Sequence, residues 1–296
     1  MHHIERVALL AFVAVLLAVS LAYYAPMLRH AVPPAAGPAD AADQSQPAAQ
    51  LMPPYRAPTE PNSPVSAFDA LITVDVEQIP SGYTERGTSF PLGDGLWLTA
   101  RHVVGNSCSQ IILILGGKNH SASVKYLDPN ADLAVLEVPG APSHPGLPIE
   151  QSSPEAGQSA FAFGFPQGTL GGTQDALLGR THLRLGGRLS GTAPVLAWSE
   201  TQRFPDSLDS LAGISGGPML DENGNVIGII VAASVRRGRN YTVAPEILLD
   251  IQRQLGTKPG QQPARDAILQ PVSLETSANA LRQDSRIAQT YCIPPS

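Results

Sequence analysis

The sequence carries little positive charge, few aromatic residues and only two cysteines. The net charge is −6, and aromatic residues make up 5% of the chain. A protein that binds nucleic acid needs a basic stripe to meet the phosphates, and this chain has none. Its only basic cluster is Arg236, Arg237 and Arg239, which we interpret as the solvated tip of a hairpin. We therefore expect no nucleic-acid partner.

Several ligand-binding motifs are missing as well. The chain has neither a P-loop nor a dinucleotide-binding fingerprint. His120, His144 and His182 are scattered without the spacing of metal ligands, which indicates surface or loop positions. We therefore expect no metal ion and no organic cofactor.

The 296 residues are 43% hydrophobic, enough core for one large domain or two small ones. Changes in composition predict four segments. These are an anchor or signal peptide (1–30), a disordered Ala/Pro-rich linker (31–65), a folded domain (66–256) and a polar C-terminal tail (257–296). The linker has almost no large apolar residues and cannot bury a core, so we expect it to act as a spacer.

The N-terminal segment contains an uncharged run of 22 residues, Val7–Leu28. That length suffices for a membrane-spanning helix, and Tyr23 and Tyr24 stand where an interfacial aromatic belt would lie. We favour an uncleaved anchor with the N-terminus inside. The alternative is a signal peptide, because Ser20–Ala22 fits a small-x-small cleavage site. Either way, the rest of the chain is expected to be exported.

From Ala67 onward, short alternating segments typical of β-strands are separated by turn residues. Asn223-Gly224 is a direct hairpin signal, and Pro245 begins a predicted helix that ends at Leu255. About a dozen strands and one closing helix predict an all-β fold of two packed six-stranded β-barrels. We expect residues 132–138 to complete the first barrel.

Leu208–Leu220, LDSLAGISGGPML, is the stretch around which the chain is organised. Its glycines permit backbone angles that other residues avoid, and they leave backbone N–H groups bare around Ser215. An oxyanion hole is built from such groups. A serine is a weak nucleophile by itself, so a base and a group that orients the base must come from elsewhere.

The order of the histidines restricts the class of site. None of the seven follows Ser215, which excludes the α/β-hydrolase order of serine, acid and histidine. His102 ends an apolar run in TARHVV, and Asp132 stands at a turn-to-strand junction in ADLAVLEV. The order His, Asp, Ser remains, as on the two-barrel protease fold.

These three motifs resemble those of trypsin-like serine peptidases, whose TAAHV, DLAVLK and G-N/D-S-G-G-P segments they follow in order. Gly87–Phe90 and Gly164–Gly168 are similar to segments of the bacterial HtrA-like branch. The resemblance covers roughly residues 67–255. It implies the chymotrypsin fold and a serine endopeptidase that takes a polypeptide substrate.

The resemblance also implies roles for individual residues. Ser215 is the nucleophile, His102 the general base, and Asp132 orients the imidazole. The backbone N–H groups of Gly213 and Ser215 form the oxyanion hole. A strand made of Val231, Ala232 and Ala233 pairs with the substrate backbone. Ile214 departs from trypsin-like zymogens, which carry Asp there, so activation by cutting the N-terminus is not expected.

Asp209 stands six residues before Ser215, the spacing at which trypsins carry the Asp that selects Arg or Lys. A carboxylate in a narrow, partly dry pocket needs a cation as its partner. The alternative is that Asp209 lies in a solvated loop, and HtrA-like enzymes usually prefer small aliphatic residues at this subsite. The sequence leaves both possibilities open.

Cys108 and Cys292 permit a single disulfide in an oxidising compartment, and two free thiols are the alternative. A bridge would fix the C-terminal tail beside His102. That tail is too short and too poor in strands for the PDZ domain that HtrA-like proteins usually carry.

Taken together, the sequence predicts a serine endopeptidase tethered to the inner membrane by its N-terminal helix, with the protease domain on the periplasmic side. Secretion after signal cleavage is the alternative location. An inactive protease-like module that binds peptides and a structural envelope protein are the rival functions. The sequence predicts no oligomeric state.

Overall fold

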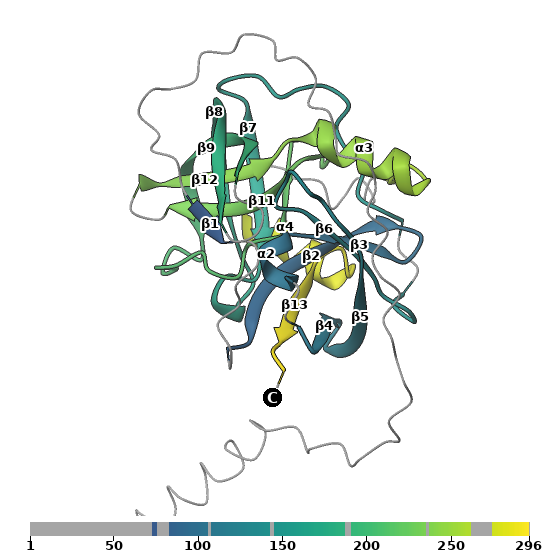
Figure 1. Cartoon of the computed structure of the whole chain (residues 1–296). Helices are drawn as coiled ribbons and strands as arrows, with labels where there is room; N and C mark the ends of the chain where they lie inside the picture. The colour runs from purple at the N-terminus through teal and green to yellow at the C-terminus, as the bar shows by residue number, and fades with distance from the viewer. Residues whose placement is uncertain are drawn as a thin grey trace, which may run out of the picture. The chain divides into compact units, whose positions relative to one another are not determined.

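The computed structural model describes residues 73–75 and 83–295, apart from 106–107, 143–144, 187–190, 235–236 and 262–273. The predicted anchor and the linker up to residue 65 lie outside the described residues. Within the described part, no helix is both long and apolar enough to cross a membrane. Strands dominate, as predicted, and the helices are few (Figure 1).

Six strands form a closed barrel in the order β13-β2-β3-β6-β5-β4. Their bounds are β2 Glu85–Gly93, β3 Leu96–Thr99, β4 Gln110–Leu115, β5 Lys118–Leu127, β6 Ala134–Glu137 and β13 Ala288–Ile293. Neighbouring strands in this barrel are antiparallel. Because β13 lies between β2 and β4, the last strand of the described chain is a barrel neighbour of strands far earlier in the sequence (Figure 1).

The C-terminal segment departs from the prediction of a polar tail. After the helix α4, Leu274–Gln283, it provides β13, so residues 132–138 do not complete the barrel by themselves. In β13, buried residues alternate with half-buried ones. One buried position is Thr290, whose hydroxyl is hydrogen-bonded to Ser89 at 2.5 Å. Polar residues on the buried face weaken the apolar alternation by which a strand is recognised.

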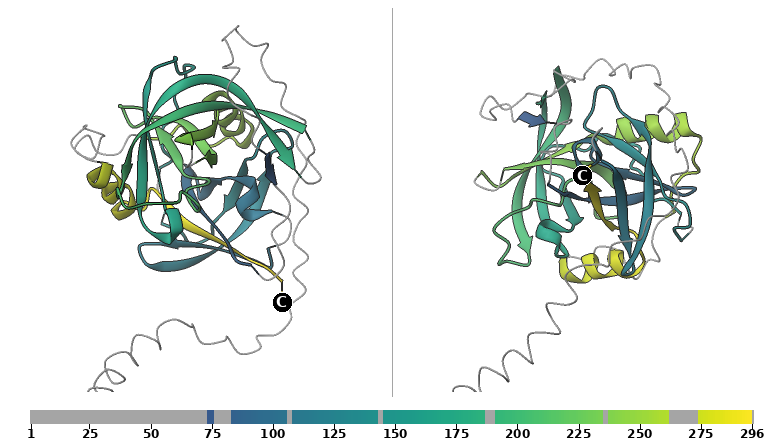
Figure 2. Two further views of the ribbon diagram at one scale, coloured as in Figure 1. Left: turned by 90° about the vertical axis from the view of Figure 1, so that its left-hand side faces the viewer. Right: turned by 60° about the horizontal axis from the view of Figure 1, so that its bottom comes forward.

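The remaining strands form a second, seven-stranded sheet in the order β1-β8-β7-β10-β11-β12-β9, with an additional pairing between β8 and β9. Their bounds are β1 Thr73–Asp75, β7 Ser159–Gly164, β8 Gly171–Gly186, β9 Gly191–Phe204, β10 Pro218–Leu220, β11 Val226–Ser234 and β12 Arg239–Val243. The long, curved β8 and β9 are prominent in this sheet (Figure 2). One closed six-stranded barrel and a mixed sheet therefore stand where two six-stranded barrels were predicted, and β1 joins β8 in parallel.

The predicted closing helix is α3, Pro245–Leu255. Proline occupies its first turn, where its missing N–H costs no helical hydrogen bond. Gly256 ends it in the left-handed conformation, with φ of 66°, as is common at helix C-termini. Ile247, Leu248 and Ile251 are buried in the larger of two hydrophobic clusters.

Candidate active site

His102 and Asp132 lie together at one edge of the barrel. His102 is in α2, Arg101–Val104, a single helical turn that follows β3. Its Nδ1 is 2.6 Å from Asp132 Oδ2, and its backbone N–H donates to Asp132 Oδ1 at 2.8 Å. Asp132 is 1% exposed. Because both carboxylate oxygens are engaged, the ring orientation is fixed, and Nε2 is the nitrogen left for chemistry.

The turn that carries Asp132 is built on Asp128, a residue that sequence reasoning passed over. Asp128 Oδ1 accepts the N–H groups of Asn130 and Ala131, both at 2.8 Å, and Oδ2 accepts the Tyr126 hydroxyl at 3.2 Å. Arg101, next to His102, donates to the Asp128 carbonyl at 2.6 Å. An Asp that bonds its own backbone two residues on is a recognised turn signal, and D-P-N-A-D contains it. His102 and Asp132 are thus connected directly by their own hydrogen bonds and again through Arg101 and the Asp128 turn.

The pKa of His102 lies above its ordinary value. Burial alone would lower that pKa, because it disfavours the imidazolium. The Asp132 carboxylate outweighs burial through its charge and its hydrogen bond, and Glu85 adds a smaller effect of the same sign. The site therefore stabilises a positively charged imidazole, which is the state that a general base reaches after taking a proton.

The loop around Ser215 packs against the residues just before His102. Gly216 has φ of 85°, and a Cβ there would lie 2.2 Å from the Thr88 carbonyl oxygen and 2.3 Å from Thr99 Oγ1. No side chain fits in that space, so glycine is required by contact as well as by backbone conformation. Gly216 N–H donates to the Ile230 carbonyl at 2.7 Å. The loop is thereby fixed between β11 and the beginning of α2, and Ser215 itself is half-buried.

The backbone N–H groups of Gly213 and Ser215 point away from the carbonyls of the residues before them, and both of those carbonyls are hydrogen-bonded. The Ala212 carbonyl accepts from Gln167 N at 2.6 Å, and the Ile214 carbonyl accepts from Gly217 N at 2.9 Å. In a trans peptide the N–H points opposite to the C=O, which turns the Gly213 and Ser215 N–H groups to the other side. Neither N–H donates to an acceptor within the described ranges.

Ile214 is 1% exposed and belongs to the smaller hydrophobic cluster, with Leu211, Ile230 and Trp198 among its members. An apolar anchor therefore holds the loop at the position where zymogens carry an Asp. Burial of one such side chain stabilises by roughly 1.5–3 kcal/mol. The loop conformation is held without any ion pair at this residue.

The predicted substrate strand is part of β11. Val231 and Ala232 are buried, Ala233 is half-buried, and this end of β11 pairs with β12. Asp209 is exposed, and its Oδ1 accepts from Gln167 Nε2 at 2.6 Å. Its hydrogen-bond partner is thus a neutral amide, and the Arg203 guanidinium interacts with it electrostatically.

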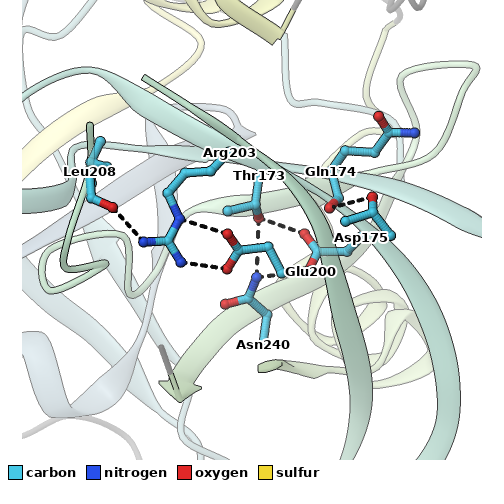
Figure 3. A network of polar contacts seen from close by, with 8 residues as sticks. Thr173, Gln174, Asp175, Glu200, Arg203, Leu208 and Asn240 are labelled. Carbon is cyan, nitrogen blue, oxygen red and sulfur yellow. Dashed lines mark hydrogen bonds and ion pairs between the residues drawn. The ribbon is translucent and has the colours of Figure 1, made fainter. Parts of the chain in front are cut away.

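A polar network holds the segment that leads to Ser215 (Figure 3). Arg203 donates to the Leu208 carbonyl at 2.5 Å. Its other two nitrogens donate to the two carboxylate oxygens of Glu200 at 2.6 and 2.8 Å. Beside this pair, Asp175 accepts from Thr173 at 2.5 Å and from Asn240 at 2.8 Å. The bonds of Arg203 tie β9 to the beginning of the loop, and those of Asn240 tie β12 to β8. Sequence reasoning missed it, because these polar residues become neighbours only when the strands pair.

Cys108 and Cys292 are joined in a disulfide, with their Cα atoms 5.2 Å apart. Of the three histidines predicted to be surface or loop residues, His120 is half-buried in β5, His182 is exposed in β8, and His144 lies outside the described residues. Across the described ranges, no three His, Cys, Asp or Glu side chains are grouped so as to hold a metal ion.

Part of this chain is similar to known proteins. The family profile of the trypsin-like peptidase domain matches residues 87–229. The serine protease Rv3671c of Mycobacterium tuberculosis is 30% identical over 178 residues, which are 59% of this chain and 43% of that protein. A probable periplasmic serine endoprotease, DegP-like, of Chlamydia trachomatis is 30% identical over 156 residues, 50% of this chain and 28% of that protein.

Among solved structures, the active form of the Rv3671c protease from M. tuberculosis superposes with a TM-score of 0.50 at 20% identity. The match covers 69% of this chain and 97% of that one, and it shows a shared fold. The chain spans less than half the length of the curated relatives that it matches. Over residues 87–229, the chain carries a domain of the trypsin-like peptidase family.

Proposed function

We propose that this protein is a serine endopeptidase in which Ser215, His102 and Asp132 act as one unit. The observation that carries the proposal is the pair of hydrogen bonds from His102 to the two Asp132 oxygens, next to a loop with two unengaged N–H groups. The relatives named serine proteases support the same reaction class.

In the proposed reaction, Ser215 Oγ attacks the scissile carbonyl and His102 Nε2 takes the hydroxyl proton. Asp132 remains ionised and stabilises the imidazolium, which then donates the proton to the leaving amine. The N–H groups of Gly213 and Ser215 receive the developing oxyanion. One such donor contributes about 2.7–4 kcal/mol to transition-state stabilisation. A water molecule then attacks the acyl-enzyme while His102 takes its proton, and the proton returns to Ser215 as the carboxylic acid product leaves.

The substrate backbone is expected to add to the edge made by Val231, Ala232 and Ala233, where main-chain hydrogen bonds give affinity. Small side chains at Ala232 and Ala233 leave room for an incoming strand. No cleavage of the N-terminus is needed for activity, because the buried Ile214 already anchors the nucleophile loop.

The proposed location is outside the cytoplasm, with the protease domain tethered through Val7–Leu28. The disulfide supports an oxidising compartment, where such bonds form and persist. The relative described as periplasmic supports the same side of the membrane. Extraction with alkaline carbonate tests the tether, since a protein that begins near Tyr23 and is soluble would show a cleaved signal peptide instead.

The test of the function is labelling by a fluorophosphonate probe, followed by turnover of a peptide library. We expect the probe on Ser215 in the wild type, and none in Ser215→Ala. His102→Ala is expected to label very slowly, because the serine then lacks its base. A folded wild-type protein that neither reacts with the probe nor cuts any peptide would be the inactive peptide-binding module.

A further inference from the structure

Thr88, in β2, is 0% exposed and makes hydrogen bonds to four residues in three other segments. Its backbone N–H donates to the Ser215 carbonyl at 2.8 Å, and its hydroxyl donates to the Gly213 carbonyl at 2.8 Å. That hydroxyl also accepts Phe165 N–H at 3.0 Å. The Thr88 carbonyl accepts the Thr99 hydroxyl at 2.8 Å.

The direction of the hydroxyl hydrogen bonds follows from the partners. An amide N–H can only donate, so the Thr88 oxygen accepts from Phe165 and uses its own hydrogen for the Gly213 carbonyl. Thr88 therefore bonds the carbonyls of both residues whose N–H groups are proposed to form the oxyanion hole. No other described side chain donates to either carbonyl.

Gly213 is thereby held from both sides. The peptide before it is fixed by Gln167 N on the Ala212 carbonyl, and the peptide after it is fixed by Thr88 on the Gly213 carbonyl. Its φ of 103° lies in the region open to glycine, where no Cβ restricts rotation. Without these two bonds, the Gly213 N–H would be free to turn away from the site.

The same residue reaches the general base. Thr99, which bonds the Thr88 carbonyl, is three residues before His102 and ends β3. Thr88 also holds Phe165, whose carbonyl lies 2.7 Å from where a Cβ of Gly213 would be. Thr88 therefore bonds the Ser215 loop, the strand that precedes His102 and the Phe165 segment from one position in the barrel.

We propose that Thr88 is a positioning residue. Its hydroxyl sets the oxyanion-hole geometry by fixing the peptide that follows Gly213. This inference rests on the proposed peptidase function and adds a residue to it. A residue that only stabilised the contact between the barrel and the second sheet would change the unfolding temperature and leave transition-state binding intact. The two roles therefore differ in a measurable way.

The test compares Thr88→Val, which keeps the shape and removes the hydroxyl, with Thr88→Ser, which keeps the hydroxyl. We expect kcat to fall about 10–100-fold in Thr88→Val with KM unchanged, less than the loss of a whole oxyanion donor. Thr88→Ser should retain kcat within about twofold, since the hydrogen bonds to Gly213 and Phe165 can persist. Affinity for a peptide boronic acid should fall with kcat, and affinity for a product peptide should not.

The matched control is Thr290→Val, which removes another fully buried threonine hydroxyl, the one bonded to Ser89. It should lower the unfolding temperature and leave kcat unchanged. Thr88→Ala serves as a second variant that avoids placing a methyl group against the Gly213 carbonyl.

Wild-type kcat in folded Thr88→Val or Thr88→Ala would overturn the proposal, as would equal losses of boronic acid and product affinity. Failure of both variants to fold would assign Thr88 a purely structural role and would also overturn it. A wild type that cuts no peptide would overturn the proposed function instead, so the two failures are distinguishable.

Discussion

Cys292, in the last strand of the chain, is bonded to Cys108, which follows His102 by six residues. The disulfide therefore joins the strand that closes the barrel to the loop after the helix that carries the proposed base. Ser109 N–H adds a backbone bond to the Ile293 carbonyl at 2.7 Å. The C-terminal segment is part of the framework around His102.

Removing this disulfide should destabilise the protein. The bridge closes a loop across 184 residues, and cross-links of long loops contribute about 2–5 kcal/mol to the free energy of unfolding. The double variant Cys108→Ala/Cys292→Ala should lose about that amount in urea unfolding. Adding a reducing agent should destabilise the wild type similarly and leave the double variant unchanged. Equal sensitivity of both proteins to reductant would contradict the assignment.

The acid limb of the pH profile of kcat/KM should have its midpoint above the ordinary histidine pKa of 6.5. A general base must be neutral, and the Asp132 carboxylate, with help from Glu85, raises the pKa of His102. Activity is therefore lost as the pH falls through that raised value. Glu85→Gln should move the midpoint to lower pH and leave the plateau rate unchanged. A midpoint at or below 6.5 in the wild type would contradict this prediction.

The predictable parts of the molecule are those that local sequence determines. The helix from Pro245 to Leu255 has proline at its start and a left-handed Gly256 after its end, and both signals act over a few residues. His102 and Asp132 were found because each stands in a short family motif. Their hydrogen bonds join residues 30 positions apart, so only the fold could bring them together.

The parts that sequence reasoning missed depend on contacts between distant segments. β13 completes the barrel only by pairing with β2, about 200 residues earlier in the chain, and its buried Thr290 obscures the pattern of a strand. Thr88 and Ser215 are likewise far apart in sequence. A threonine in an alternating strand is ordinary until the carbonyls that it bonds are known.

Asp209 provides a test of substrate preference. Its carboxylate is exposed, is bonded to Gln167 and interacts electrostatically with Arg203, so it does not require a cation from the substrate. We therefore expect Asp209→Ser to change the ratio of kcat/KM for Arg over Val before the scissile bond by less than about tenfold, which is 1.4 kcal/mol. Peptides with Arg, Lys, Val and Ala at that position provide the comparison. A loss approaching the roughly 3–5 kcal/mol of a broken buried charge pair would instead place Asp209 at the base of a trypsin-like pocket.

Asp175 should make stability fall as the pH rises through the mildly acidic range. It is 1% exposed, and burial raises its pKa from 3.8 to about 6, against the opposing effects of the Thr173 and Asn240 hydrogen bonds. Glu200 raises this pKa slightly further and Arg203 lowers it. The folded protein thus prefers the protonated acid more than the unfolded chain does. The cost of ionising it is absent below about pH 3.8 and is fully present above about pH 6. A shift of about two units corresponds to about 3 kcal/mol.

Asp175→Asn keeps the shape without the charge, so the unfolding free energy of the wild type minus that of the variant should fall by up to this amount between pH 4 and pH 7. Urea unfolding at several pH values measures the difference, and a difference that rises with pH would show that the hydrogen bonds from Thr173 and Asn240 outweigh burial.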